Sequence, residues 1–211
     1  MKSESKIFSP QPFTIDYSPL TMFIEPQIPH KHKGWIEVIC GSMFSGKTEE
    51  LIRRLKRVKI ANQSVKIFKP AIDNRFSDKK IVSHDENFIH SISIKHSFEI
   101  LSQIENVEVV GIDEAQFFDS ALPDVLKKLA LQGIRVIAAG LDMDYLGVPF
   151  GVMPQLMADA EYVTKVHAIC VKCGSIANHS HRTINNDAQI VLGAKNNYEP
   201  LCRHCFADAT I

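Results

Sequence analysis

The chain has 211 residues, of which 45% are hydrophobic and 23% charged, as in an average globular protein and unlike a disordered chain. This length fits one domain, or one domain with a small appendage. Lysine plus arginine and aspartate plus glutamate each number 24, so the net charge is zero. No overall positive field therefore attracts a nucleic acid or an anionic membrane, and we expect any polyanion to bind at a local site.

The apolar stretches are too short for a membrane span. The longest, 107–112 and 134–141, are six to eight residues long, whereas a span needs about 20. Pro10, Pro12 and Pro19 interrupt the sequence that follows the charged start, which argues against a secretory signal. We expect a cytoplasmic protein that binds neither membrane nor nucleic acid.

The first 33 residues hold five of the ten prolines and no periodic apolar pattern. We predict that 1–33 is an extension outside the core. From Trp35 the composition changes. Residues 35–40 form a short apolar run that ends at a glycine and predicts a buried strand. Residues 48–60 then predict a helix, with Leu51, Leu55 and Val58 on one face and the basic residues mostly elsewhere.

Further strands and helices alternate along the chain. Apolar runs at 65–68, 107–112 and 134–139 predict strands, and 121–132 predicts a helix. This alternation indicates an α/β fold, a mainly parallel sheet with flanking helices. From about 166 the pattern thins into Cys, His and Asn. We therefore expect a catalytic domain at 34–165 and a small metal-supported lobe at 166–211.

The segment GSMFSGKT matches the phosphate-binding loop G-x-x-x-x-G-K-[ST], in which backbone N–H groups converge on phosphate oxygens. The alternative is a glycine turn that binds nothing, but the position between a predicted strand and helix favours phosphate. The lysine would reach the β and γ phosphates, and the threonine hydroxyl would hold Mg²⁺. The predicted phosphate-binding residues are Gly41, Ser42, Met43, Phe44, Ser45, Gly46, Lys47 and Thr48.

Two carboxylates follow the predicted strand 107–112. A P-loop enzyme needs an acidic residue at the end of a neighbouring strand to hold Mg²⁺, and Asp113 is the candidate. Glu114, in an extended strand end, would point away from Asp113 toward a second substrate and suits a general base. The alternative is that Glu114 is a solvated helix-cap acid.

Motifs of other P-loop proteins narrow the choice of class. The Asn-Lys-x-Asp motif with which GTPases read guanine does not occur in the sequence. Helicases need a second motor domain and a longer chain. Small kinases and compact ATPases remain.

Four of the five cysteines form two Cys-x-x-Cys pairs: Cys170, Cys173, Cys202 and Cys205. Two such pairs match a tetrahedral Zn²⁺ site, and four thiolate ligands leave no open position, so the site would be structural. The alternatives are unligated cysteines, or a nearby histidine (His167, His179, His181 or His204) in place of one ligand. The fifth, Cys40, is interpreted as a buried apolar residue.

Taken in order, these motifs resemble the cytosolic-type (type II) thymidine kinase family. The resemblance covers residues 34–206 and is far more specific than the phosphate loop alone. The matching segments are GSMFSGKT (41–48), DNRF (73–76), SHD (83–85), IDEAQFF (112–118), LD (141–142) through PFG (149–151), the two Cys pairs and Tyr198.

The resemblance implies a P-loop ATPase-like domain and a zinc-supported lobe whose lasso loop, between the Cys pairs, closes over a nucleoside. The implied reaction transfers the γ-phosphoryl of ATP, with Mg²⁺, to the 5′-hydroxyl of thymidine or deoxyuridine in pyrimidine salvage. The family is usually homotetrameric and inhibited by dTTP. By the same resemblance Glu114 is the general base, and Asp73, Arg75 and Gln116 join Asp113 in the phosphate and metal region. The implied nucleoside residues are Met43, Phe117, Leu141, Tyr145, Phe150, Ser180, Val191, Leu192, Gly193, Ala194 and Tyr198.

Some positions depart from the family pattern. Tyr145 stands where Phe is expected, and 192–194 lacks the usual Gly-Gly pair. Without the family, Phe117, Phe118 and Phe150 would be taken as ordinary core. Two rival functions stay open: a kinase of another deoxynucleoside, and a nonenzymatic ATP-dependent zinc ribbon that binds nucleic acid, which the few cations of the lobe disfavour.

Overall fold

The computed structural model describes residues 33–72, 80–82, 88–184 and 197–210. Residues 1–32 of the predicted extension lie outside these ranges. Within them, no helix has both the length and the apolar character needed to cross a membrane.

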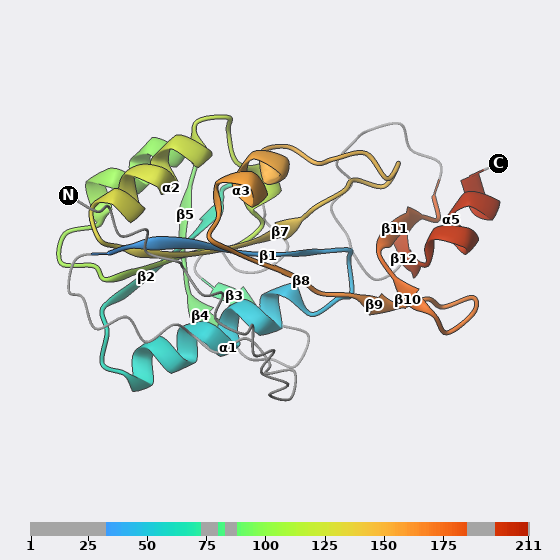
Figure 1. The fold of residues 1–211 in the computed structure, drawn as a ribbon, viewed down its shortest axis with the longest axis horizontal. Helices are drawn as coiled ribbons and strands as arrows, with labels where there is room; N and C mark the ends of the chain where they lie inside the picture. The colour runs from blue at the N-terminus through green and yellow to red at the C-terminus, as the bar shows by residue number, and fades with distance from the viewer. Residues whose placement is uncertain (1–32, 73–79, 83–87, 185–196, 211) are drawn as a thin grey trace, which may run out of the picture.

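A six-stranded parallel sheet forms the centre of the molecule, in the order β5-β2-β6-β7-β1-β8 (Figure 1). Central strands β1, β6 and β7 are almost wholly buried, as expected for a parallel sheet covered on both faces. The fold class predicted from the sequence is confirmed. The strands are β1 (Trp35–Gly41), β2 (Val65–Pro70), β5 (Ile92–Ile94), β6 (Val109–Ile112), β7 (Arg135–Leu141) and β8 (Tyr162–Lys165).

Helices cover both faces of this sheet. Helix α1 (Lys47–Ile60) lies on one face, and α2 (Leu122–Leu131) and α3 (Met153–Asp159) lie on the other (Figure 1). Each face has its own core: Leu51, Leu55 and Val58 of α1 are buried in one, and residues of α2, α3 and the 3-10 helix η1 (Ser97–Gln103) in the other. The helices predicted at 48–60 and 121–132 agree with α1 and α2 to within a residue at each end.

Helix α1 has one basic residue in its buried face, where the sequence pattern predicted apolar residues. Arg54 is fully buried, although the basic residues were expected mostly away from the apolar face. It pairs with Glu37 of β1, also fully buried, at 2.7 Å, and with Glu50 at 2.8 Å. Arg135 of β7 reaches the other oxygen of Glu37 at 2.7 Å. The partners compensate the cost of burying each charge.

A small lobe continues from β8 at one end of the molecule (Figure 1). It consists of two antiparallel pairs and a helix, with a core cluster of its own. The Val166 N–H donates to the Cys40 carbonyl, so the lobe begins beside the end of β1. Its elements are β9 (Ala168–Ile169), β10 (Ile176–Ala177), β11 (His179–Arg182), β12 (Tyr198–Leu201) and α5 (Arg203–Thr210). A further antiparallel pair joins β3 (Lys80–Val82) and β4 (Phe88–His90).

Candidate active site and metal centre

The candidate residues of the catalytic domain gather where β6, β7 and β1 end. These strands are consecutive in the sheet and parallel, so the phosphate loop after β1 and the carboxylates after β6 lie at the same edge. We expected the acidic residue on a strand next to β1. Instead β7 lies between β6 and β1, and its last residue, Leu141, lies at the same edge of the sheet, between the phosphate loop and the carboxylates.

The phosphate loop needs its glycines for two reasons. Gly41 has φ +148°, and a Cβ there would lie 2.1 Å from the carbonyl oxygen of Val166. Gly46, just before α1, is left-handed with φ +84°. Phe44 takes φ +63° without being glycine, which is a strained conformation typical of functional loops. The loop wraps back on itself, because the Ser45 hydroxyl donates to the Ser42 carbonyl at 2.7 Å.

Lys47, the first residue of α1, bends over this loop. Its ammonium group donates to the Ser42 carbonyl at 2.6 Å. Burial lowers the pKa of Lys47, and the opposing pull of Glu114 and Asp113 offsets part of that effect. Both carboxylates are therefore close enough to act on the phosphate-loop lysine, as a phosphoryl-transfer site requires.

Asp113 and Glu114 take different positions at the end of β6. Asp113 is only 8% exposed, and its carboxylate accepts the Glu114 N–H at 3.0 Å. Glu114 is not in the extended conformation that we expected, because its φ of +52° is left-handed. It precedes the 3-10 helix η2 (Ala115–Phe117), but its side chain does not cap it. Glu114 thus occupies the N-cap position of η2 that the helix-cap interpretation gave it, but its side chain makes no capping hydrogen bond there.

Gln116 joins Glu114 to the end of β7. Its amide nitrogen donates to Glu114 Oε2 at 2.5 Å, and its amide oxygen accepts the Leu141 N–H at 2.9 Å. A Cβ at Gly140 would lie 2.8 Å from this oxygen, and one at Gly151 would lie 2.4 Å from the Gln116 carbonyl. Two glycines thus allow the buried amide to fit between two strand ends.

The three aromatic residues of this region separate into two environments. Phe118 belongs to the large core cluster, so it is an ordinary core residue. Phe150 is also buried, with 7% exposed, whereas Phe117 is only partly buried, and the two rings meet edge to face with centroids 5.5 Å apart. Phe117 is the last residue of η2, so this aromatic pair is joined to Glu114 through one short helix.

The lobe contacts the phosphate loop directly. The Met43 N–H donates to the Ser180 hydroxyl oxygen of β11 at 2.9 Å. The Ser42 hydroxyl lies 3.5 Å from the Ala177 carbonyl of β10. Residues 130 or more apart in sequence therefore meet at one site, and the lobe forms one of its walls.

Tyr145 and Tyr198 are brought together by a residue that sequence reasoning missed. Arg182, at the end of β11, stacks on the Tyr145 ring and donates to the Tyr198 hydroxyl. In the sequence, Arg182 stands out only as the end of the segment 180–182, which departs from a more usual Gln-Arg or Lys-Arg ending in the family, and as one of the few cations of the lobe; the tyrosines are 37 residues before it and 16 after it.

Six predicted site residues lie outside the described residues, so the structure says nothing of them. They are Asp73, Arg75, Val191, Leu192, Gly193 and Ala194.

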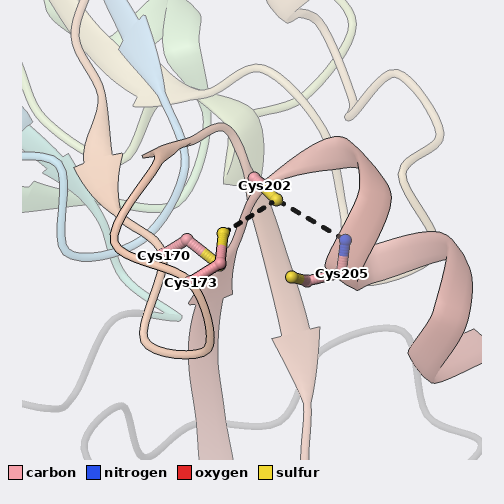
Figure 2. Close-up of side chains that lie close together, drawn as sticks. All are labelled: Cys170, Cys173, Cys202 and Cys205. Atoms are coloured by element: carbon pink, nitrogen blue, oxygen red, sulfur yellow. Dashed lines mark hydrogen bonds between the residues drawn. The ribbon is translucent and has the colours of Figure 1, made fainter.

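The four paired cysteines converge in the lobe (Figure 2). Cys170 and Cys173 come from the turn after β9, Cys202 follows β12, and Cys205 lies in α5. Their sulfur atoms all lie within 4.8 Å of one another, with 3.6 Å between Cys173 and Cys202. A tetrahedral zinc with Zn–S bonds of ~2.3 Å separates its sulfurs by about 3.8 Å. These residues are positioned to bind a metal ion.

The surroundings of these cysteines shift their pKa values in opposite directions. Hydrogen bonds with Ser175 lower the pKa of Cys173, whereas hydrogen bonds with Cys202 and Cys173 raise the pKa of Cys205 to about 12. Burial raises the pKa of Cys170, but hydrogen bonds from the backbone of Cys202, Cys173 and Lys172 outweigh it, so the pKa falls to about 6. Among the described residues, the metal-binding group contains the cysteines alone. His179 instead stacks on Phe206, with centroids 4.4 Å apart.

Cys40 has a different environment from the other four. It is fully buried at the end of β1. Burial, followed by the charge of Asp142, raises its pKa to about 11. As predicted, it is a small apolar residue of the core.

Comparison with known proteins gives a consistent result. A family model described as thymidine kinase matches residues 34–206, from the start of β1 to the second Cys pair. A thymidine kinase of Bacteroides fragilis (strain YCH46) is 60% identical over 191 residues, 90% of this chain and 96% of that protein. That of Rhodothermus sp. (strain ITI 518) is 59% identical over 173 residues, 82% of this chain and 81% of that protein. That of Porphyromonas gingivalis (strain ATCC 33277) is 58% identical over 174 residues, covering 82% and 85%.

Proposed function

This chain belongs to the thymidine kinase family, and we propose that the site at the end of β1, β6 and β7 transfers the γ-phosphoryl of ATP to the 5′-hydroxyl of thymidine or deoxyuridine. The observation that carries the proposal is the sheet topology, which brings Lys47, after β1, and Asp113 and Glu114, after β6, to the same edge of the parallel sheet. The two carboxylates act electrostatically on the phosphate-loop cation there. The product is the 5′-monophosphate, and the reaction belongs to pyrimidine salvage.

The loop 41–48 binds the phosphates of ATP. Its backbone N–H groups and the start of α1 favour negative charge, and Lys47 adds a cation that the phosphates would draw from the Ser42 carbonyl. Thr48 and the buried Asp113 have the oxygen donors that Mg²⁺ prefers and would hold it, with Gln116, Asp73 and Arg75 as further members of this region. When bound, Mg²⁺ neutralises charge on the phosphate oxygens.

Glu114 accepts the proton of the attacking 5′-hydroxyl. The hydrogen bond that the Gln116 amide donates to Glu114 Oε2 orients the carboxylate. The left-handed backbone at Glu114 turns the chain at this point. We infer that the two neighbouring carboxylates therefore have different roles, Asp113 toward Mg²⁺ and Glu114 toward the 5′-hydroxyl. A base so close to the phosphate loop suits direct transfer between the two substrates, because phosphoryl transfer depends mainly on positioning and charge.

The nucleoside binds between the Phe117–Phe150 pair and the lobe. A flat pyrimidine fits an apolar slot, and the backbone of a closing loop can read its imide edge. The residues proposed to line this slot are Met43, Phe117, Leu141, Tyr145, Phe150, Ser180, Val191, Leu192, Gly193, Ala194 and Tyr198.

The metal of the lobe is proposed to be Zn²⁺. Four sulfurs at near-tetrahedral spacing match its preferred donors and leave no position for water. Zinc would cross-link the turn after β9 to the end of β12 and the start of α5.

Regulation, assembly and location complete the proposal. We infer a cytoplasmic homotetramer that dTTP inhibits, as the family resemblance implies. Light scattering gives the molar mass of the assembly. Titration of dTTP against a fixed thymidine concentration tests the inhibition, which should be competed by excess thymidine or ATP.

Incubation of the purified protein with ATP, Mg²⁺ and thymidine tests the reaction itself. Chromatography should show thymidine 5′-monophosphate and ADP formed in equal amounts. Lys47→Met is the matched negative control, because it keeps the length of the side chain and removes its charge. ATP hydrolysis without phosphorylated thymidine would contradict the proposal and indicate an ATPase.

A further inference from the structure

Arg182 is a buried cation at the junction of three segments. It is the last residue of β11, and only 8% of it is exposed. In the β11–β12 pair it stands opposite Tyr198. A buried guanidinium is costly unless its surroundings compensate the charge, so the groups around Arg182 indicate its role.

Two tyrosines from different segments surround this guanidinium. Its carbon lies 3.5 Å from the centroid of the Tyr145 ring, which is direct stacking, and 5.4 Å from that of Tyr198. Its Nε and Nη2 donate to the Tyr198 hydroxyl at 3.2 and 2.9 Å. A planar guanidinium can stack on one ring while it donates to the other hydroxyl in this way, and an ammonium group cannot.

The loop that carries Tyr145 is itself well fixed. The buried Asp144 carboxylate accepts the N–H groups of Leu146 and Val148 at 2.9 and 3.2 Å. Gly147, with φ +75°, lies against the rings of the lobe, where an added Cβ would be 3.4 Å from the nearest atoms. The backbone of the loop is thus fixed by Asp144, and the Tyr145 ring is held against the lobe by its stacking on Arg182.

We propose that Arg182 is a positioning residue for nucleoside specificity: by stacking on Tyr145 and donating to Tyr198, it fixes the two aromatic side chains that bound the pyrimidine slot on the lobe side. The inference rests on the proposed function, which places both tyrosines in that slot. Arg182 acts through these rings, so its loss should change the binding of the nucleoside and leave that of ATP unchanged.

Steady-state kinetics of Arg182→Met, Tyr198→Phe and the double variant test this inference. Arg182→Met should raise the KM for thymidine roughly tenfold, the scale of a lost buried cation–π contact. The KM for ATP should stay within twofold of its original value. Tyr198→Phe removes only the hydroxyl that accepts the hydrogen bonds of Arg182. The KM of the double variant for thymidine should be no higher than that of Arg182→Met alone, because both substitutions break the same hydrogen bonds between Arg182 and Tyr198. Arg182→Lys should not restore the KM.

The controls separate this role from a structural one and from the proposed function. Arg57→Met changes an exposed arginine of α1 in the same way and should leave both KM values unchanged. Urea unfolding of each variant reports stability. A folded Arg182→Met protein with unchanged KM for thymidine, or with both KM values raised equally, overturns the inference. Should that variant not fold, additive effects of Tyr198→Phe and Tyr145→Leu on the KM overturn it instead. Absence of thymidine phosphorylation by the unaltered protein refutes the proposed function itself.

Discussion

The buried pair between Arg54 and Glu37 allows a quantitative prediction, because Arg53 provides a matched control on the same helix. Both arginines pair with Glu50, Arg53 at 2.6 Å and Arg54 at 2.8 Å. The Arg53 side chain is 41% exposed, whereas those of Arg54 and Glu37 are fully buried. The same substitution therefore removes a solvated pair at one position and a desolvated one at the other.

Arg54→Met should lower the free energy of unfolding by about 3 kcal/mol, the lower end of the ~3 to 5 kcal/mol that follows the loss of one partner of a buried ion pair. The lower end applies because Glu37 keeps Arg135 and the Trp35 indole N–H, each at 2.7 Å. Arg53→Met should cost less than about 0.5 kcal/mol, since exposed pairs contribute little.

Urea unfolding followed by far-UV circular dichroism measures both variants. With a slope of ~2 to 3 kcal/mol/M, the midpoint of Arg54→Met should fall by about 1 M. The midpoint of Arg53→Met should hardly move. If the two variants lose the same stability to within about 0.5 kcal/mol, the reasoning that burial makes the Arg54 pair essential is refuted.

Three further predictions concern the site, the metal and the pH dependence of stability. Glu114→Gln should keep the hydrogen bond from Gln116 and lower kcat by ~10² to 10⁴, as loss of a general base does; near-normal turnover would exclude Glu114 as the base. Elemental analysis should find about one Zn²⁺ per chain, and Cys202→Ser should lose it together with stability; zinc-free protein prepared without chelators would contradict the metal assignment. Burial tends to raise the pKa of Asp119, but the hydrogen bonds that Ser97 and Ala121 donate to its carboxylate bring the pKa below its ordinary value. A depressed pKa contributes stability above the ordinary value of 3.8 that is lost as the pH falls through the folded-state pKa, so Asp119→Asn should lower the stability at pH 7 and progressively less below pH ~4; a deficit that is independent of pH would refute this.

The sequence predicted those features that depend on local pattern. Apolar runs located β1, β2, β6 and β7, and the two Cys-x-x-Cys pairs identified the cysteine cluster that is positioned to bind a metal ion, because chelation from a tight turn depends on spacing alone. The short strand β8 and helix α3 were missed. In β8 half-buried and exposed residues alternate, as suits the edge of a sheet, and α3 has only seven residues.

Contacts between distant segments could not be predicted in this way. Arg54 looks like a solvated helix residue until Glu37, 17 residues earlier, is placed beside it by the β1–α1 packing. The proposed role of Arg182 depends on its contacts with two tyrosines on other segments. Such pairings follow from topology, and residue type and spacing do not encode them.

The pyrimidine specificity of phosphorylation is the measurement that tests the account most directly. Thymidine, deoxyuridine, deoxycytidine and deoxyguanosine are supplied at equal concentrations with ATP and Mg²⁺, and the four monophosphates are separated and counted. Thymidine and deoxyuridine share an imide edge and should both be phosphorylated. Deoxycytidine presents a donor amine in place of a carbonyl, and a mispaired buried group costs ~1 to 3 kcal/mol, so it should be disfavoured by one to two decades. Deoxyguanosine should be excluded by size. Comparable phosphorylation of deoxycytidine or deoxyguanosine would contradict the account and indicate a broader deoxynucleoside kinase.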